Sequence, residues 1–214
     1  MVYCMSDIHG EASRFRAMLK KIRFSGEDTL YILGDVIDRK PGGVEILEQI
    51  MRTANMVMLM GNHERMCVDT IGPCNVYGSR ELWRQNGGSC TWRDLVYHHT
   101  PAQRNRLLRF MMNLPDHLEV EVNGRRFYLV HASPSEKPAA RLWDRPNPHA
   151  PAAFEDRTVI VGHTPTCFFD PENDGPLRIW HGNGIIDIDC GCGHDEPRRR
   201  LACLRLDDMK EFYI

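Results

Sequence analysis

Side chains that can bind metal ions follow five apolar, strand-like runs of this sequence. They are Asp7, His9, Asp35, Asn62, His131 and His163. Binding sites in α/β sheets form at the carboxyl ends of the strands, so we expect these five ends to meet in one cleft. Carboxylate, amide and imidazole ligands without a thiolate suit Mn, Fe or Zn, and they differ from a thiolate-rich structural zinc site. The pattern therefore predicts a metal centre.

Three of the six residues directly follow a glycine, namely Gly34, Gly61 and Gly162. Glycine has no Cβ, so the backbone at these positions can come close to an ion. A single Asp or His at the end of a strand is usually a turn residue or an ordinary hydrogen-bonding group. Six such residues, repeated at one strand end after another, favour a metal site over that simpler interpretation.

The composition is that of a globular protein without a strong overall charge. The chain has 214 residues, of which 42% are hydrophobic and 26% charged, and its net charge is −2. A single domain over 1–214 is the simplest interpretation, and no overall field recruits nucleic acid or a membrane. No apolar run reaches the roughly 18 residues that cross a bilayer. Because no targeting segment fits before Asp7 and the 8 cysteines are scattered, we expect a cytoplasmic protein.

The first half of the chain alternates strand-like and helix-like segments, which predicts an α/β core. Strands are expected at 2–6, 29–33 and 55–60, with helices at 11–22 and 41–52 between them. Apolar residues at helical spacing then predict a helical insert at about 64–114, interrupted at Gly72-Pro73 and Gly87-Gly88.

The second half is dominated by strand-like segments. They are expected at 118–122, 126–130, 158–161, 177–180, 185–188 and 201–206. Asn123-Gly124 is a strong signal for a hairpin between the first two of these strands. Residues 134–151 contain five prolines, which exclude a regular helix or a central strand. We therefore expect this segment to be an ordered surface loop, of the kind that often serves function.

The metal-binding motifs, taken in order, resemble those of the calcineurin-like metallophosphoesterases. They are Ser6-Asp7-Ile8-His9-Gly10, Gly34-Asp35-Val36-Ile37-Asp38-Arg39, Gly61-Asn62-His63-Glu64, His131-Ala132 and Gly162-His163-Thr164. The chain is most similar to the bacterial and phage branch of the phosphoprotein phosphatases, through 82–88, Trp143-Asp144-Arg145 and Asp189-Cys190-Gly191. Ser6 and Lys40 stand where that family usually has glycine, and neither position supplies a ligand.

This resemblance implies a four-layer αββα sandwich, with helices outside and two central mixed β-sheets inside. It also implies two divalent metal ions, with Mn2+ as the first choice and Fe or Zn as alternatives. The first ion would be bound by Asp7, His9 and Asp35. The second would be bound by Asp35, Asn62, His131 and His163, which makes Asp35 the bridge. Two such ions lower the pKa of a shared water, and the resulting hydroxide attacks phosphate in line.

The resemblance also assigns the groups that act on the substrate. Arg39 and Arg145, together with Asn62, would bind the phosphate, since a planar guanidinium can bond two oxygens at once. His63 would be the general acid that protonates the departing alkoxide. Asp38 would hold His63 in the useful tautomer and raise its pKa.

Three functions are compatible with these residues. The first is hydrolysis of phosphate monoesters, with phosphoserine or phosphothreonine in proteins as natural substrates. The second is hydrolysis of symmetrical dinucleoside polyphosphates such as diadenosine tetraphosphate, by enzymes that share these motifs but are generally longer. The third is a non-catalytic phosphate-binding module, which loss of a ligand or of the acid histidine would favour. The expected partner is a phosphoprotein or a phosphorylated small molecule, and neither nucleic acid nor a membrane.

Several residues outside these roles have simpler interpretations. Cys190, Cys192 and His194 alternate, and strand-like alternation explains this spacing, which is not that of a zinc ribbon, better than a metal site does. The run 198–200 of three arginines is expected to be a solvated turn. Glu64 is expected to be a structural residue at the start of a helix. Trp83 and Trp92 are expected to be packing residues. His181 is expected to be a surface or loop residue, with a place in the lining of the cleft as the alternative.

Overall fold

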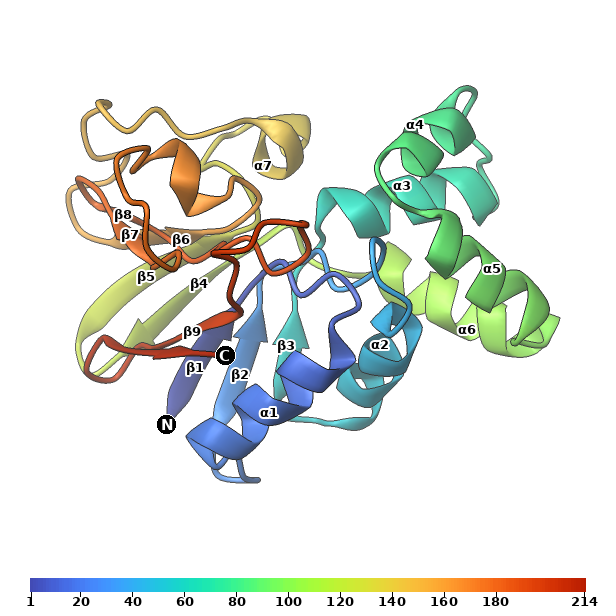
Figure 1. Ribbon diagram of the computed structural model, residues 1–214, viewed down its shortest axis with the longest axis horizontal. Coiled ribbons are helices and arrows are strands. Elements are labelled where there is room, and N and C mark those ends of the chain that lie inside the picture. Colours follow the sequence, from blue (N-terminus) through green and yellow to red (C-terminus); the bar gives the residue numbers. More distant parts are fainter.

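The computed structural model describes all residues 1–214, which form two five-stranded sheets (Figure 1). The first sheet has the order β10-β9-β1-β2-β3. Its strands are β1 (Val2–Met5), β2 (Thr29–Ile32), β3 (Met56–Met58), β9 (Ala202–Arg205) and β10 (Lys210–Tyr213). Since β1, β2 and β3 are parallel, their carboxyl ends lie at one edge, whereas β9 and β10 are antiparallel to their neighbours.

The second sheet has the order β4-β5-β6-β8-β7. Its strands are β4 (His117–Val122), β5 (Arg125–Val130), β6 (Thr158–Val161), β7 (Trp180–His181) and β8 (Ile185–Asp187). The expected hairpin joins β4 to β5, and both Asn123 and Gly124 have the positive φ that a two-residue hairpin turn requires. Strands β5, β6 and β8 are parallel, so a second set of carboxyl ends is brought together.

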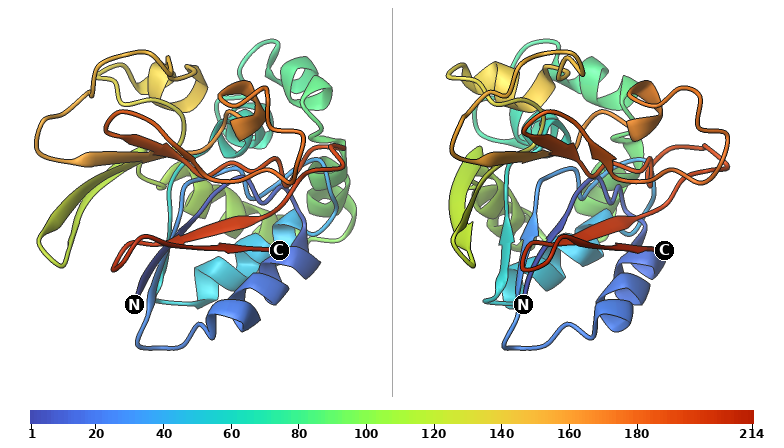
Figure 2. Two further views of the ribbon diagram at one scale, coloured as in Figure 1. Left: turned by 60° about the vertical axis from the view of Figure 1, so that its left-hand side comes forward. Right: turned by 90° about the vertical axis from the view of Figure 1, so that its left-hand side faces the viewer.

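The two sheets lie face to face, and the turned views show them as two layers (Figure 2). Between them lies a core that includes Leu33, Phe127 and Ile160. A larger core, which includes Phe15 and Leu47, joins the first sheet to its helices. This arrangement confirms the predicted αββα sandwich with two mixed sheets.

The helices fall into two groups. Helices α1 (Ala12–Ile22) and α2 (Gly43–Arg52) pack against the first sheet (Figure 1). The expected helical segment consists of α3 (Asn62–Ile71), α4 (Ser79–Gln85), α5 (Ser89–Tyr97) and α6 (Pro101–Met112), stacked beside that sheet. No helix combines the length and the hydropathy that a membrane span would need.

The structure corrects two of the expected elements. The proline-rich segment does contain a helix, α7 (Pro138–Trp143), because Pro138 occupies its first turn, where no backbone N–H is needed. The strand expected at 177–180 is limited to its last residue, in β7. Leu177 and Ile179 are buried, but their amides bond to the Arg198 carbonyl and the Tyr213 hydroxyl rather than to a strand.

Candidate active site

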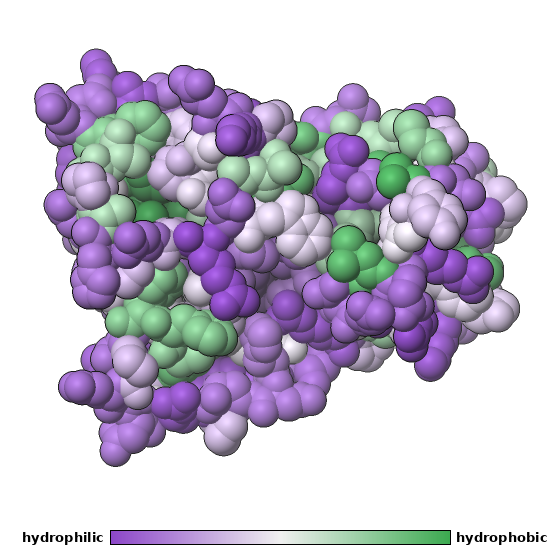
Figure 3. All heavy atoms as spheres, turned by 90° about the horizontal axis from the view of Figure 1, so that it is seen from above, coloured by the Kyte–Doolittle hydropathy of each residue, from purple (hydrophilic) through white to green (hydrophobic).

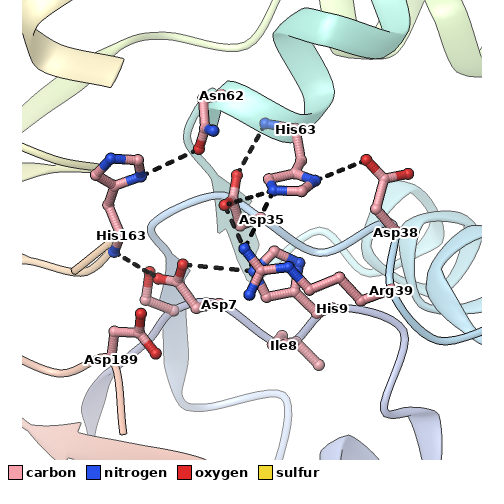
Figure 4. A network of polar contacts seen from close by, with 12 residues as sticks. Asp7, Ile8, His9, Asp35, Asp38, Arg39, Asn62, His63, His163 and Asp189 are labelled. Atoms are coloured by element: carbon pink, nitrogen blue, oxygen red, sulfur yellow. Dashed lines mark hydrogen bonds and ion pairs between the residues drawn. The ribbon is translucent and has the colours of Figure 1, made fainter. Parts of the chain in front are cut away.

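The six predicted metal ligands come together at the shared edge of the two sheets. Asp7 and His9 follow β1, Asp35 follows β2, and Asn62 begins α3 just after β3. His131 follows β5 and His163 follows β6. All except His163 are almost fully buried, and Figure 4 shows Asp7, Asp35, Asn62 and His163 gathered around a common space. Viewed from above, the face over these strand ends is mostly hydrophilic, with smaller hydrophobic patches between (Figure 3).

Glycines permit the close approach of the ligand-bearing loops. A Cβ on Gly34 would lie 2.6 Å from the Cα of Gly61. On Gly61 it would lie 2.3 Å from Oδ1 of Asp35, and on Gly162 it would lie 2.2 Å from Oγ of Ser6. The space that a side chain would fill is therefore taken by a neighbouring loop, which places the ligands side by side.

Several residues of the site have φ and ψ angles in the left-handed region of conformational space. Positive φ values occur at Asp7 (52°), His9 (46°), Asp35 (53°), Asp38 (72°), Arg39 (65°) and His163 (70°). Non-glycine residues rarely adopt this conformation, and each instance costs about 1–3 kcal/mol. These turns direct the side chains of residues only one or two positions apart toward the same space.

His9 presents an unprotonated nitrogen to the two carboxylates. Its Nδ1 donates to the Ile37 carbonyl oxygen at 3.1 Å, so the neutral ring has its lone pair on Nε2. That Nε2 lies 3.7 Å from Oδ1 of Asp7 and 3.6 Å from Oδ2 of Asp35. It is buried and has no hydrogen-bond partner. A lone pair facing two carboxylates is unfavourable unless a cation lies among them.

His131 and His163 repeat this arrangement on the other side of Asp35. His131 donates from Nδ1 to the Leu33 carbonyl at 2.7 Å, and His163 donates from Nε2 to the Trp143 carbonyl at 3.2 Å. Their other nitrogens lie 2.9 and 3.2 Å from the Asn62 side-chain oxygen. These contacts bring lone pairs together, so they require either a cation or rotation of the Asn62 amide to present its nitrogen.

The donor set therefore fits metal binding. Each of the three histidines uses one nitrogen to bond a backbone carbonyl, which fixes the tautomer and aims the other nitrogen at the shared space. Two groups of side chains each offer ligand atoms that lie within 4.8 Å of one another: His9, Asp35 and His63 form one group, and Asp35, His131 and His163 form the other. Burial, with the charges of Asp7 and Glu64, raises the pKa of Asp35 well above its usual range, and a bound cation would reverse that shift.

Glu64 holds the loop that carries Asp35. Its carboxylate is fully buried and accepts hydrogen bonds from the backbone N–H groups of Asp35 (2.8 Å), Val36 (2.9 Å), Ile37 (3.3 Å) and Gly61 (3.2 Å). The structural role expected for Glu64 is thus larger than that of a helix-start residue, because one side chain fixes the loops after both β2 and β3.

The imidazole of His63 lies beside the carboxylate of Asp35 and is oriented by the carboxylate of Asp38. The His63 Nδ1 lies 2.7 Å from Oδ2 of Asp38, and its Nε2 lies 3.8 Å from Oδ2 of Asp35. Burial alone would lower the pKa of His63, but the negative charges of Asp35 and Asp38 outweigh it and raise this pKa. His63 therefore favours the protonated form that a general acid needs.

Trp83 is a residue whose role the sequence did not indicate. Its Nε1 donates to the same Asp38 oxygen at 2.7 Å, and the indole is buried. The Asp38 amide donates to Oγ1 of Thr91 at 3.0 Å, and the Arg39 amide donates to the Gly87 carbonyl at 3.1 Å. The helical segment thus holds the loop of Asp38 and Arg39 in place.

Arg39 extends over the site beside His63. Its Nη2 lies 3.4 Å from Nε2 of His63, and its Nη1 lies 2.7 Å from Nε2 of His194. His194 is a second residue with an unexpected role, since it accepts a hydrogen bond from the guanidinium. The loop before it also packs closely, because a Cβ on Gly193 would lie 2.4 Å from His9.

Arg145 lies at the rim rather than among the buried groups. Its guanidinium is 4.9 Å from the ring centroid of Phe168, and the side chain is exposed. The pKa of His163 is lowered to about 3, chiefly by burial, and the charge of Arg145 contributes to this shift. Arg145 therefore lies near the second group of ligands, at the exposed edge of the site.

The remaining sequence features have structural roles. Cys190 and Cys192 are buried free thiols, and His181 pairs with Glu211 at 2.7 Å on the surface. The three arginines of 198–200 are not a solvated turn. Arg198 donates to the Asn173 carbonyl, Arg199 pairs with Glu11, and Arg200 donates to the Leu177 carbonyl, so each guanidinium ties two segments of the fold together.

Comparisons with known proteins show the family of this chain. The calcineurin-like phosphoesterase family matches residues 1–195. An uncharacterized protein of Methanocaldococcus jannaschii is 25% identical over 88% of this chain and 72% of its own length. A symmetrical bis(5'-nucleosyl)-tetraphosphatase of Acidovorax ebreus is 29% identical over 61% of this chain, and the match spans only 43% of that relative.

Solved structures show the same fold. A metallophosphoesterase from Sphaerobacter thermophilus has a TM-score of 0.61 at 20% identity, covering 99% of this chain and 86% of its own. A protein serine/threonine phosphatase from Saccharomyces cerevisiae has a TM-score of 0.64 at 13% identity, covering 100% and 78%. With its motifs gathered in one site and the family matched over most of its length, this chain belongs to the calcineurin-like phosphoesterases, a family that uses divalent metals.

Proposed function

We propose that this protein is a phosphomonoester hydrolase with two divalent metal ions, acting on phosphoserine or phosphothreonine in proteins. The observation that carries the proposal is the position of His63. One ring nitrogen bonds Asp38, and the other faces the space between Asp35 and Arg39. A protonated imidazole held there lies beside both the converging metal ligands and an arginine, which is the combination that ester hydrolysis needs.

The converging ligands would hold the two ions. Asp7, His9 and Asp35 would bind one, and Asp35, Asn62, His131 and His163 the other. We propose Mn2+ as the preferred ion, with Fe or Zn as alternatives, because the donors are oxygen and imidazole nitrogen. When bound, such ions activate a water molecule and offset charge on the phosphate.

The residues of the chain would bind the substrate and move one proton. Arg39 would bond the phosphate oxygens, aided by Arg145 from the rim and by Asn62 at the ligand edge. His63 would give its Nε2 proton to the departing alkoxide, with Asp38 stabilising the imidazolium before that transfer. His194 would position Arg39, and Trp83 would position Asp38, without binding the reacting phosphate.

A second candidate is hydrolysis of symmetrical dinucleoside tetraphosphates. It is supported by the relative of that name, which matches 61% of this chain. Both candidates use the same metal site and the same acid, so they differ only in the leaving group. We also infer a reducing compartment such as the cytoplasm, since all eight cysteines are free thiols.

The experiment that tests this proposal compares substrates after metal is restored. Metal-free protein is supplied separately with Mn2+, Zn2+ or Fe2+ and assayed on an aryl phosphate, on phosphopeptides and on diadenosine tetraphosphate. We expect turnover of the phosphopeptides. Preference for the dinucleotide would support the second candidate, and absence of turnover on all three with metal bound would contradict enzymatic activity.

A further inference from the structure

A cavity of about 230 Å³ opens between helices α4 and α5, outside the group of metal ligands. It is lined by Arg80, Trp83, Arg84, Gly88, Ser89, Trp92 and Arg93. Three arginines in so small a space are unusual, because like charges repel. None of the metal ligands contributes to the lining.

The positive charge of this cavity is only partly compensated. Arg84 pairs with Glu81 at 2.7 Å, so one of the three guanidinium groups is neutralised. Arg80 and Arg93 are exposed and form no ion pair or hydrogen bond within the chain. The nearby carboxylate of Asp94 faces His99 instead, at 3.6 Å. Two arginines therefore line the cavity with guanidinium groups that are not paired within the chain.

The aromatic part of the cavity is preformed. The guanidinium of Arg80 lies 5.8 Å from the ring centroid of Trp92, a cation–π arrangement that orients it while leaving its N–H edges free. Trp92 packs edge-on against Tyr97, with 5.7 Å between the ring centroids, and it stays half-buried, so part of the indole is exposed at the cavity. The Trp83 indole forms the deep wall, covered by Gly88, where a Cβ would lie 2.4 Å from its Nε1.

We propose that this cavity binds a nucleotide, with its phosphate on Arg80 and Arg93 and its base against Trp92. A guanidinium pair selects a phosphate, and an indole face selects a planar ring. A nucleotide carries both groups on one small molecule, and its ribose can span from one to the other. Inorganic phosphate would use only the arginines, and a nucleoside only the indole.

The cavity is connected to the acid of the active site by a single side chain. Trp83 forms its wall with one side and donates from Nε1 to Asp38 at 2.7 Å, and Asp38 in turn faces His63 Nδ1. A ligand that presses on the indole therefore changes the position of the group that orients His63. Through this contact, a ligand bound in the cavity would change kcat.

The test is AMP binding measured by calorimetry on the whole protein, with Mn2+ and after chelation. We expect Arg80→Ala/Arg93→Ala to weaken binding about tenfold or more in both states, whereas Arg16→Ala/Arg52→Ala, two exposed arginines on α1 and α2, leaves it unchanged. Trp92→Ala should weaken AMP but not ribose 5-phosphate. Binding that disappears on chelation, or that ignores both cavity variants while circular dichroism shows them folded, would overturn the proposal.

The nucleotide in the cavity could be a free molecule or the nucleoside arm of a dinucleotide substrate, and kinetic measurements distinguish the two. A free nucleotide would change kcat for an aryl phosphate without raising its KM, and Arg80→Ala/Arg93→Ala would abolish that response. A nucleoside arm of the substrate would instead make the same variant lose kcat/KM on diadenosine tetraphosphate alone. These kinetic measurements rest on the proposed hydrolase activity, whereas the binding measurements do not, so failure of one is distinguishable from failure of the other.

Discussion

Trp83 and Asp38 are joined by a hydrogen bond of 2.7 Å from the indole Nε1 to the carboxylate oxygen that also faces His63. Both partners are buried, and Trp83 comes from a helix 45 residues further along the chain. Helix α4 thus contributes to the acid of the site without supplying a metal ligand. His63 is held by Asp38, and Asp38 is held by Trp83.

The first prediction concerns this indole. Trp83→Phe keeps most of the packing but removes the donor, so Asp38 gains freedom to turn away from His63. We expect about a tenfold loss in kcat on esters with poor leaving groups, and little loss on an activated aryl ester that does not need the proton. Trp180→Phe, a matched change at a half-buried indole of β7 that forms no hydrogen bond, is the control. Equal losses on both esters would argue against a positioning role.

The pH dependence of the acid gives a second prediction. The pKa of His63 is raised, so its protonated form persists to higher pH and activity falls as pH rises through that pKa. Asp38→Asn removes one of the charges that raise it. The alkaline loss of kcat on poor leaving groups should therefore move to lower pH in this variant. A pH profile identical to that of the unchanged protein would show that a group other than His63 controls the alkaline loss of kcat.

A third prediction concerns Arg39 and His194. His194→Ala leaves one edge of the guanidinium without its acceptor, so we expect KM for phosphorylated substrates to rise roughly three- to tenfold, the effect of about one hydrogen bond. His194→Gln, which offers an acceptor oxygen, should recover much of the loss. His98→Ala, at an exposed histidine, should have no effect. A change confined to kcat would contradict the proposed role.

Metal binding should stabilise the fold. Because the ligands converge only in the native state, Mn2+ at about 100 times its Kd should add roughly 2.7 kcal/mol to the free energy of unfolding and raise Tm accordingly. Asp35→Asn should remove most of this increase, and Asp174→Asn, at an exposed carboxylate, should retain it. Thermal unfolding with and without Mn2+ checks the difference. A Tm that does not respond to Mn2+ in the unchanged protein would contradict metal binding here.

A fifth prediction tests whether the loops after β1 and β6 must lie as close together as they do. The Cβ in Gly162→Ala would lie 2.2 Å from Oγ of Ser6 and 2.3 Å from Oδ2 of Asp7. We expect weaker Mn2+ binding and a lower Tm, with partial recovery in Ser6→Gly/Gly162→Ala, which removes one of the two clashes. Gly26→Ala, where nothing lies within 4 Å, is the control. Unchanged Mn2+ affinity in Gly162→Ala would show that the loops can separate without consequence.

Much of this architecture could be predicted from the sequence because the signals are local. Apolar strands ending in a glycine and a polar residue indicated where the chain turns, and Asn123-Gly124 indicated the hairpin. The helix inside the proline-rich segment could also have been recognised, since Pro138 is compatible with a first helical turn. β10 had no such signal, because its position depends on pairing with β9.

The parts of the site that escaped prediction depend on contacts between distant segments. Nothing in the pattern around Trp83 distinguishes an indole that only packs from one that bonds Asp38, and His194 lies 155 residues from Arg39. The arginines of 198–200 find their acceptors in Glu11 and the Leu177 carbonyl. Such pairings arise only after folding, so spacing along the chain does not predict them.

The positive φ angles of Asp7, His9, Asp35 and His163 lower the stability of the fold at positions whose side chains the metal site requires. At each of these positions glycine would relax the backbone and remove the side chain that the site needs. Selecting variants for heat resistance alone should therefore enrich substitutions that destroy the metal centre. Selecting for activity should keep a costly local geometry and move stabilising changes to the sheets and helices. The catalytic edge is thus the part of the molecule where an engineer should expect gains in Tm to come at the expense of function.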